Sequence, residues 1–140
     1  MISYCATYNY ALSEQTKKGL KTKLHALIID DEIDICYLLK NILQQRNLKA
    51  EYVTSLGEAE KFLQVFDPPI IFLDNHLSDG FGINQIRNMK KEHPASKVVM
   101  ITAHDNPLDR EKAYQEGVDY FITKPFSRNA ILKTIENIGL

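Results

Sequence analysis

Cysteine is scarce in this sequence, and neither a long apolar run nor a strong net charge is present. The two cysteines, Cys5 and Cys36, are too few for a disulfide framework and have no metal-binding spacing. No apolar run approaches the roughly 20 residues that a membrane-spanning helix needs, and none follows a basic start as in a secretory signal. A net charge of −1 argues against binding to nucleic acid through bulk charge. We therefore expect a cytoplasmic protein that contacts neither a membrane nor, directly, nucleic acid.

The composition indicates a single globular domain that follows an N-terminal extension. The chain has 140 residues, and 44% of them are apolar, which is enough for one domain with a substantial core. Residues 1–22 show no sustained hydrophobic period, and residues 1–23 hold four lysines against one glutamate. We predict a partly disordered extension, or a linker, at residues 1–22 and one domain at residues 23–140.

Short apolar runs alternate with helical patterns five times along the chain. In residues 70–74, four apolar residues lead directly into Asp74, which is typical of a strand covered on both faces. Strands are expected at 24–29, 50–53, 70–74, 97–102 and 119–123, and helices at 35–43, 55–66, 83–89, 107–117 and 127–137. Residues 75–82 are rich in turn formers and are read as a turn. The pattern predicts an α/β protein with the flavodoxin-like (βα)5 doubly wound sheet, five parallel strands in the order 2-1-3-4-5.

Four of the predicted strands lead into specific polar residues, namely Asp30-Asp31, Asp74, Thr102 and Lys124. These strands are neighbours in the predicted order, so the polar side chains should meet at one edge of the sheet. Three carboxylates packed together resist ionisation, and Mg²⁺ relieves their repulsion. A metal ion beside a free carboxylate and a lysine suits a phosphoryl group, which the carboxylate can accept as an aspartyl phosphate. Ala103, directly after Thr102, is small and leaves space for that group.

With these motifs the chain resembles the receiver domain of bacterial two-component response regulators. The resemblance covers about residues 24–138, and its order and spacing are more specific than any single motif. The matching motifs are Asp30-Asp31, Asp74 after an apolar strand, Thr102-Ala103 and Lys124-Pro125-Phe126.

The resemblance implies a phosphoacceptor and a metal site. Asp74 would accept a phosphoryl group from a phosphohistidine on a sensor histidine kinase or a histidine phosphotransfer protein. Asp31 would bind Mg²⁺ directly and Asp30 through water. Asp74 and the backbone carbonyl of His76 would complete the protein ligands.

The resemblance also implies a switch. Thr102 and Lys124 would hold the phosphoryl oxygens, and Phe121 stands where the family has its switch aromatic residue. The face formed by the fourth helix, the fifth strand and the fifth helix would then contact an effector or a second copy. The Lys124-Pro125 bond would be cis. We expect a signalling switch and no turnover enzyme, with only slow self-phosphorylation and self-dephosphorylation.

Two positions depart from the family pattern. Ser78 stands where proline is common, which predicts a softer loop, although residues 79–82 still supply its turn. Phe121 stands where tyrosine is often found, and it has no hydroxyl to hydrogen-bond, so any switching must act through packing alone.

Two histidines flank the predicted site. His76 lies two residues after Asp74, and His104 lies two residues after Thr102, directly after Ala103. They either tune the loss of the phosphoryl group or are exposed loop histidines, and the sequence leaves both readings open. A histidine-based metal site is disfavoured, because three carboxylates already serve a hard cation.

Two alternatives fit the sequence less well. A Mg²⁺-dependent phosphatase with an aspartyl intermediate needs a second aspartate two residues after Asp30, where this chain has Glu32. A receiver-like binding module that is never phosphorylated does not need the five intact site residues. The kinase partner and the output stay open, as does the choice between a stand-alone receiver, a piece of a DNA-binding regulator and a receiver from a hybrid kinase.

Overall fold

The fold is known from a computed structural model that describes residues 24–140, so the extension predicted at residues 1–22, together with Cys5, lies outside the described residues. Five parallel strands form one sheet in the order β2-β1-β3-β6-β7. This is the predicted order 2-1-3-4-5, because β4 and β5 belong to a separate two-stranded hairpin. The strands are β1 (Ala26–Ile29), β2 (Ala50–Val53), β3 (Ile70–Asp74), β4 (His76–Leu77), β5 (Gly80–Phe81), β6 (Lys97–Thr102) and β7 (Tyr120–Thr123). The helices are α3 (Ile33–Gln44), α4 (Leu56–Val65), α5 (Ile86–Glu92), α6 (Pro107–Glu116) and α7 (Arg128–Ile138), with a 3-10 turn η1 at Gly82–Gln85.

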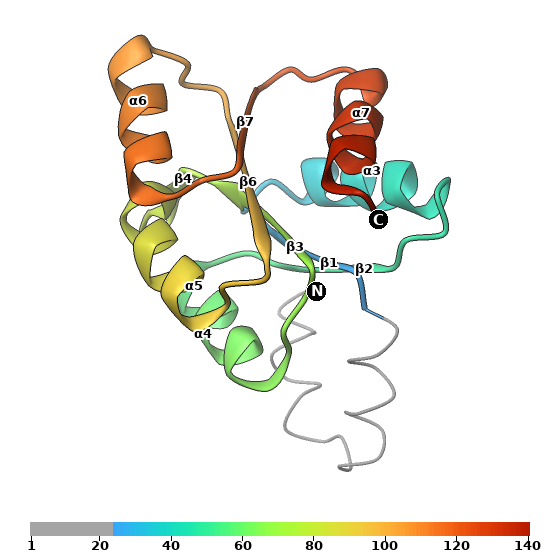
Figure 1. The fold of residues 1–140 in the computed structure, drawn as a ribbon, viewed down its shortest axis with the longest axis horizontal. Coiled ribbons are helices and arrows are strands. Elements are labelled where there is room, and N and C mark those ends of the chain that lie inside the picture. Colours follow the sequence, from blue (N-terminus) through green and yellow to red (C-terminus); the bar gives the residue numbers. More distant parts are fainter. Residues whose placement is uncertain (1–23) are drawn as a thin grey trace.

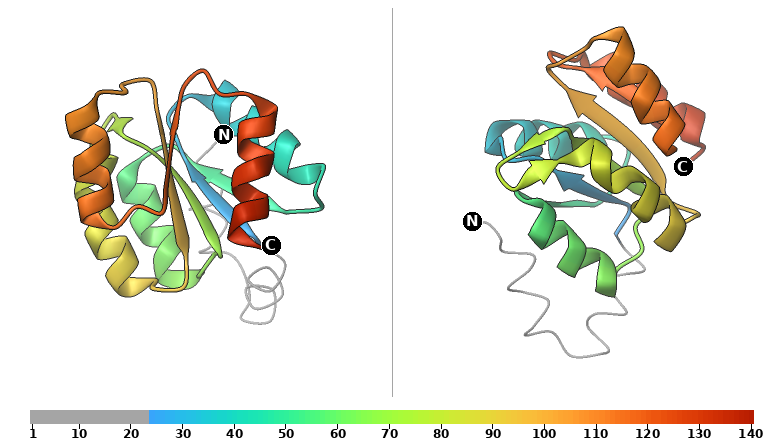
Figure 2. Two further views of the ribbon diagram at one scale, coloured as in Figure 1. Left: turned by 45° about the horizontal axis from the view of Figure 1, so that its top comes forward. Right: turned by 90° about the vertical axis from the view of Figure 1, so that its left-hand side faces the viewer.

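Helices cover both faces of the sheet (Figure 1). Helices α3 and α7 lie on one face, and α4, α5 and α6 lie on the other, as the turned views in Figure 2 also show. Each face has its own apolar core, with Phe62, Phe66 and Ile86 on the α4–α5–α6 side and Leu39 and Ile131 on the α3–α7 side. Strand β3 is buried along its whole length, as its unbroken apolar run predicts.

The register of the sheet brings the carboxyl ends of β1, β3, β6 and β7 to one edge. Ile29 pairs with Leu73, so Asp30 and Asp74 are the next residues on neighbouring strands. Asp74 in turn pairs with Ile101, directly before Thr102 on β6. Thr102 pairs with Thr123, directly before Lys124. The predicted convergence of the site residues therefore follows from strand pairing alone.

Three of the helices begin at a capping side chain, whereas α3 and α5 have none, and α5 starts later than the helix predicted at 83–89. The side chains of Ser55, Asn106 and Ser127 accept hydrogen bonds from the amides of the residues three positions later. Gly117 ends α6 with a left-handed φ of 110°. Ser55 and Glu58 have the spacing of a capping box, but the Glu58 carboxylate accepts from the Thr54 amide and hydroxyl (2.8 and 3.1 Å). A reciprocal box would use the Ser55 amide instead.

The turn predicted at 75–82 contains a small hairpin that sequence reasoning missed. Strands β4 and β5 pair antiparallel, His76 with Phe81 and Leu77 with Gly80, and the 3-10 turn η1 follows before α5 begins at Ile86. Strands of two residues are too short to carry a hydrophobic period, so nothing in the sequence pattern separates them from a turn. Among residues 24–140, no helix is both long and apolar enough to cross a membrane.

Candidate functional site

The predicted site residues meet at the edge where the strands end. Carboxylate oxygens of Asp30, Asp31 and Asp74 all lie within 4.8 Å of one another. The Lys124 ammonium lies among them, 2.9 Å from Asp30 Oδ2 and 3.6 Å from Asp74 Oδ1. Asp30 is 2% exposed and Asp74 is 5% exposed, so both carboxylates are held in a largely dry site. The Lys124-Pro125 bond is cis, as the resemblance implied.

Burial raises the pKa values of the two inner carboxylates. For Asp74, burial is the largest cause and the charge of Asp30 adds to it, while Lys124 acts in the opposite direction; the pKa rises to about 6. The pKa of Asp30 is also raised, mainly by burial, against a lowering by the hydrogen bonds from Lys124 and the Glu32 amide. This site therefore favours any cation that can compensate the carboxylates.

Lys124 has three carboxylate neighbours, and one of them was not predicted. Burial alone would lower the Lys124 pKa, but hydrogen bonds to Asp30 and Glu32 and the charges of Asp30 and Asp74 raise it. The Glu32 carboxylate is the nearest partner, 2.7 Å from Nζ. Glu32 is an exposed residue just before α3, and only the three-dimensional proximity of the β1 and β7 ends makes it a partner of Lys124. Lys124 must exchange this contact if it is to bind an anion beside Asp74.

The two carboxylates of the Asp30-Asp31 pair differ in their hydrogen-bond and ion-pair partners. Asp30 Oδ1 accepts from the Glu32 amide at 2.9 Å, and Oδ2 pairs with Lys124. Asp31 is exposed and makes no hydrogen bond or ion pair to any residue of the described part of the chain. Asp31 is therefore the carboxylate of the pair that is free to bind a metal ion directly.

The hairpin after Asp74 leaves the backbone carbonyl of His76 without a partner in its own ladder. The Gly82 amide donates to the Asn75 carbonyl at 2.8 Å, and the Ile83 amide donates to the Asn75 side chain at 2.8 Å. Hydrogen-bonded and non-hydrogen-bonded pairs alternate in antiparallel strands, so His76 and Phe81 form a non-hydrogen-bonded pair. The His76 carbonyl is thus left out of the hairpin ladder. Gly82 is required here, because a Cβ at this position would collide with the Asp74 carbonyl oxygen.

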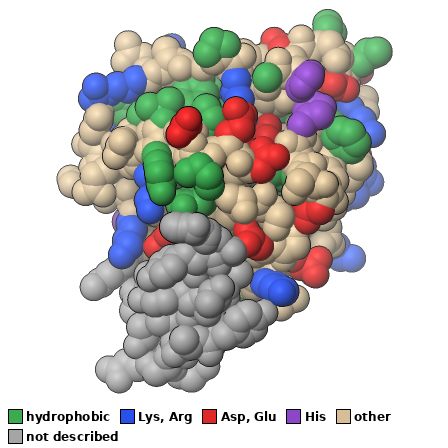
Figure 3. All heavy atoms as spheres, turned by 180° about the vertical axis from the view of Figure 1, so that it is seen from behind, with side chains coloured by type: hydrophobic (Ala, Val, Ile, Leu, Met, Phe, Trp, Pro, Cys, Tyr) green, Lys and Arg blue, Asp and Glu red, His purple; other side chains and the backbone are tan. Residues whose placement is uncertain are grey.

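The residues after β6 line the other side of the site. Thr102 is buried, and its hydroxyl accepts from the His104 amide at 3.2 Å, whereas Ala103 is exposed. The exposed His76 and His104 come from different loops, yet their ring centroids are 4.0 Å apart. Figure 3 shows neighbouring histidines beside acidic side chains on this face of the molecule. The two histidines lie far apart in the sequence, so no sequence pattern predicts that their rings meet.

Phe121 lies inward in this structure. It is 9% exposed, and the Arg110 guanidinium carbon lies 4.6 Å from the centroid of its ring. Phe121 pairs with Met100, two residues before Thr102 on the neighbouring strand. Cys36 lies buried in the core, where its thiol donates to the Asp30 carbonyl at 3.3 Å.

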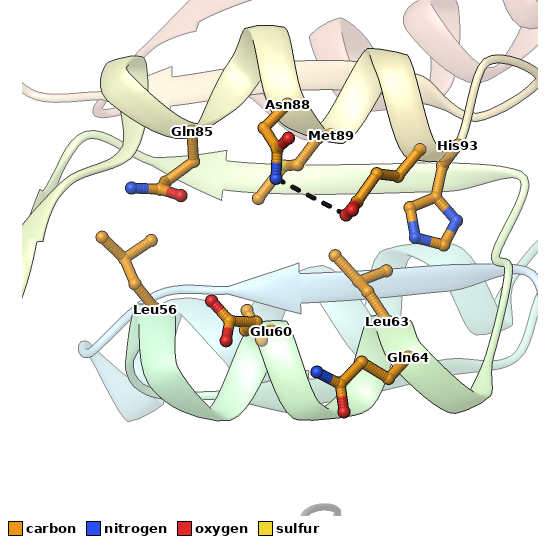
Figure 4. Close-up of a pocket in the computed structure, with 10 residues that line it drawn as sticks. Leu56, Glu60, Leu63, Gln64, Gln85, Asn88, Met89 and His93 are labelled. Atoms are coloured by element: carbon orange, nitrogen blue, oxygen red, sulfur yellow. Dashed lines mark hydrogen bonds between the residues drawn. The ribbon is translucent and has the colours of Figure 1, made fainter.

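A separate groove runs between α4 and α5 (Figure 4). Its volume is about 550 Å³, and Leu56 and Leu63 on α4 face Gln85, Asn88 and Met89 across it. None of the predicted site residues lines this groove. The chemistry of the carboxylate site gives it the stronger claim to function, because the groove holds no cluster of reactive or metal-binding groups.

Known proteins resemble this chain in both sequence and structure. Residues 26–136 match the response regulator receiver domain family. The phosphate regulon transcriptional regulatory protein PhoB of Escherichia coli is 31% identical over 114 residues, which cover 80% of this chain and 50% of PhoB. The nitrogen assimilation regulatory protein NtrX of Azorhizobium caulinodans is 33% identical over 112 residues, 79% of this chain and 25% of NtrX. The chain therefore spans half or less of the length of these relatives.

Two solved structures extend the likeness to three dimensions. The beryllofluoride-activated NtrC4 receiver domain dimer superposes with a TM-score of 0.77 at 35% identity, covering 81% of this chain and 94% of that one. The receiver domain of NtrX from Brucella abortus superposes with a TM-score of 0.75 at 30% identity, covering 81% and 96%.

Proposed function

The chain belongs to the response regulator receiver domain family, and we propose that Asp74 is its phosphoacceptor. One observation carries this proposal: the buried Asp74 clusters with the buried Asp30 and the exposed Asp31, and the Lys124 ammonium lies 3.6 Å from its carboxylate. A phosphatase with an aspartyl intermediate is not favoured, because Glu32 replaces the second aspartate that it needs and is engaged with Lys124.

We propose that Mg²⁺ binds on the side of the carboxylate cluster where Asp31 lies. Oxygen ligands from carboxylates and a backbone carbonyl suit this hard cation. Asp31 and Asp74, with the His76 carbonyl, would hold it directly, and Asp30, whose two oxygens already have partners, would act through water. When bound, Mg²⁺ neutralises carboxylate and phosphoryl charge. The raised pKa of Asp74 supports a site that needs such compensation.

The proposed transfer step is a single displacement at phosphorus. An Asp74 carboxylate oxygen forms the new bond to phosphorus while the bond to the partner's imidazole nitrogen breaks, and that nitrogen is later protonated by water. Lys124 and the Thr102 hydroxyl donate to the phosphoryl oxygens, and the small Ala103 leaves room for them. Lys124 exchanges its Glu32 contact for the phosphoryl group, and Thr102 gives up the His104 amide contact.

A small phosphodonor tests this proposal without the kinase. Incubation with acetyl phosphate and Mg²⁺ should add one phosphoryl group, seen by intact-mass spectrometry. Asp74→Asn should remove the adduct completely, while Asp109→Asn, in the first turn of α6, should leave it unchanged. An adduct that persists in Asp74→Asn would mean that another residue is the acceptor.

The proposed switch acts through Thr102 and Phe121. A phosphoryl group gives the Thr102 hydroxyl a charge-assisted acceptor and draws the side chain toward Asp74. The volume left behind is filled from the neighbouring strand, because an interior near close-packed density does not tolerate a void. The inward position of Phe121 in the unmodified chain supports a switch whose active arrangement is already populated.

We expect Phe121→Tyr to lower the population of the active arrangement in the unphosphorylated protein. A tyrosine hydroxyl must be desolvated to lie inward, so the outward rotamer should gain population when Asp74 is unmodified. Side-chain NMR at position 121, with and without beryllofluoride, measures this. Phe121 found wholly outward in the unmodified protein would contradict a pre-populated switch, and an unchanged rotamer on activation would remove Phe121 from the mechanism.

The proposed partner at the Asp74 site is a histidine kinase or a phosphotransfer protein. The proposed partner at the α6-β7-α7 face is an effector or a second copy of the chain. Two large apolar side chains on α6 support the second contact, since Leu108 is 77% exposed and Tyr114 is 47% exposed. The similar NtrC4 receiver domain is a dimer in its activated form, which makes a second copy a candidate occupant of this face. We assign the chain a signalling role with no turnover of its own.

A further inference from the structure

The β4–β5 hairpin that carries His76 is held at its base and at its tip by different residues. At the base, the carbonyl and side chain of Asn75 accept from the Gly82 and Ile83 amides. At the tip, the Asp79 carboxylate reaches another element of the fold. Its two oxygens accept from the amides of Leu56 (2.9 Å) and Gly57 (3.0 Å), the first two residues of α4.

The start of α4, which donates these hydrogen bonds, is held firmly in the fold. Helix α4 is anchored in the core by Ala59 and Phe62, each 1% exposed. The first amides of a helix have no partner within the helix, so an external carboxylate satisfies them and also interacts favourably with the helix dipole. The Leu56 side chain also lies close to the hairpin, since a Cβ placed on Gly80 would be 3.1 Å from its Cδ1.

The hairpin needs an external tie of this kind. Two strands of two residues each are not stable on their own. Position 78 is a serine, which lacks the fixed backbone angle that proline would supply there. Asp79 is the one side chain of the hairpin, within the described residues, that hydrogen-bonds to the backbone of α4.

We propose that Asp79 is a positioning residue for the metal site: by fixing the hairpin to α4 it holds the His76 carbonyl in place and so sets the affinity for Mg²⁺. This inference rests on the proposed function, in which that carbonyl is a ligand. His76 lies between the Asn75 base and the Asp79 tip, so freedom at either end moves its carbonyl. The lowered pKa of Asp79, where the Leu56 and Gly57 amides outweigh desolvation, is consistent with a carboxylate held in this contact.

The test compares two losses at the same helix end. Asp79→Ala removes the tie between hairpin and α4, whereas Ser55→Ala removes only the cap that α4 provides for itself through the Glu58 amide. Mg²⁺ affinity is measured by calorimetry on the full chain. Residues that support metal ligands typically change affinity by tenfold or more, so Asp79→Ala should weaken Mg²⁺ binding about tenfold. Ser55→Ala should leave the affinity unchanged although it also weakens the helix start.

A rescue variant separates positioning from simple loss of structure. Ser78→Pro fixes the backbone at the turn, and the Ser78 amide has no hydrogen-bond partner among residues 24–140 that proline would remove. Adding Ser78→Pro to Asp79→Ala should therefore recover most of the lost affinity. Asp79→Asn, which keeps one acceptor oxygen, should fall between the wild type and Asp79→Ala. Wild-type affinity in Asp79→Ala, or an equal loss in Ser55→Ala, would overturn the proposal.

A second measurement works without metal and keeps the two hypotheses apart. Amide hydrogen exchange of Gly82 and Ile83 in Mg²⁺-free buffer reports the opening of the hairpin. It should accelerate in Asp79→Ala and not in Ser55→Ala. A wild-type chain that binds no Mg²⁺ would refute the proposed metal site, whereas unchanged exchange in Asp79→Ala with normal wild-type Mg²⁺ binding would refute only the role of Asp79.

Discussion

Asp74→Asn should make the Mg²⁺-free protein more stable, by about 3 kcal/mol in the free energy of unfolding at pH 7.5. The reason is the buried carboxylate, whose pKa of about 6 in the folded protein exceeds the ordinary value of 3.8. Ionising Asp74 in the folded chain therefore costs more than ionising it in the unfolded chain. Asparagine has a similar shape and no charge, so the variant escapes this cost.

The pH dependence follows from the sign of this shift. Between pH 3.8 and about 6 the folded state binds more protons at Asp74 than the unfolded state, so stability falls as the pH rises through this window. The full cost is present above pH 6 and absent below pH 3.8. The advantage of Asp74→Asn over the wild type should thus shrink toward zero as the pH is lowered to 4, which urea titrations at several pH values measure.

Two controls accompany the stability measurement. Glu60→Gln, on the exposed face of α4, should change the free energy of unfolding by less than about 0.5 kcal/mol. Saturating Mg²⁺ should stabilise the wild type and reduce the advantage of the variant, because a ligand that binds the folded state stabilises it by mass action. A less stable Asp74→Asn at pH 7.5 would show that the carboxylate is compensated in the free protein and that our electrostatic account is wrong.

Asp31→Ala should weaken Mg²⁺ binding about 100-fold and Asp30→Ala only about tenfold. Asp31 has two free carboxylate oxygens, whereas both oxygens of Asp30 already have partners in Lys124 and the Glu32 amide. Losing a direct ligand removes a metal–oxygen bond, while losing the outer partner removes a water-mediated contact and some negative charge. Calorimetric titration with MgCl₂ gives both dissociation constants.

Asp34→Ala is the matched control for this titration, because Asp34 is an exposed carboxylate in the first turn of α3, close in sequence to the pair. Its dissociation constant for Mg²⁺ should equal that of the wild type. Equal losses in Asp31→Ala and Asp30→Ala would show that the direct and the water-mediated roles are assigned wrongly.

Strand order and strand ends are what the sequence predicts best in this protein. Unbroken apolar runs such as 70–74 identify buried parallel strands, and the pairing of parallel strands then brings Asp30, Asp74, Thr102 and Lys124 to one edge. Local signals also suffice for helix ends such as Asn106-Pro107 and Gly117, because a cap depends only on residues nearby in the chain.

Contacts between exposed loops could not be predicted in the same way. Glu32 and Lys124 are 92 positions apart, and Asp79 reaches amides that precede it by 22 and 23 positions. No periodicity links such pairs, and a glutamate or an aspartate in a turn is common on any surface. The hairpin at His76–Phe81 was missed because its register depends on Asn75, Gly82 and α4, none of which forms a pattern with it.

The most direct test of the central claim is to identify which aspartate carries the phosphoryl group. After reaction with acetyl phosphate and Mg²⁺, borohydride reduces an aspartyl phosphate to homoserine, and peptide mapping then locates the changed residue. We predict homoserine at position 74 alone, and none when Mg²⁺ is replaced by a chelator. Homoserine at position 30 or 31, or at no position while the protein binds Mg²⁺ normally, would contradict the assignment of Asp74 as the phosphoacceptor.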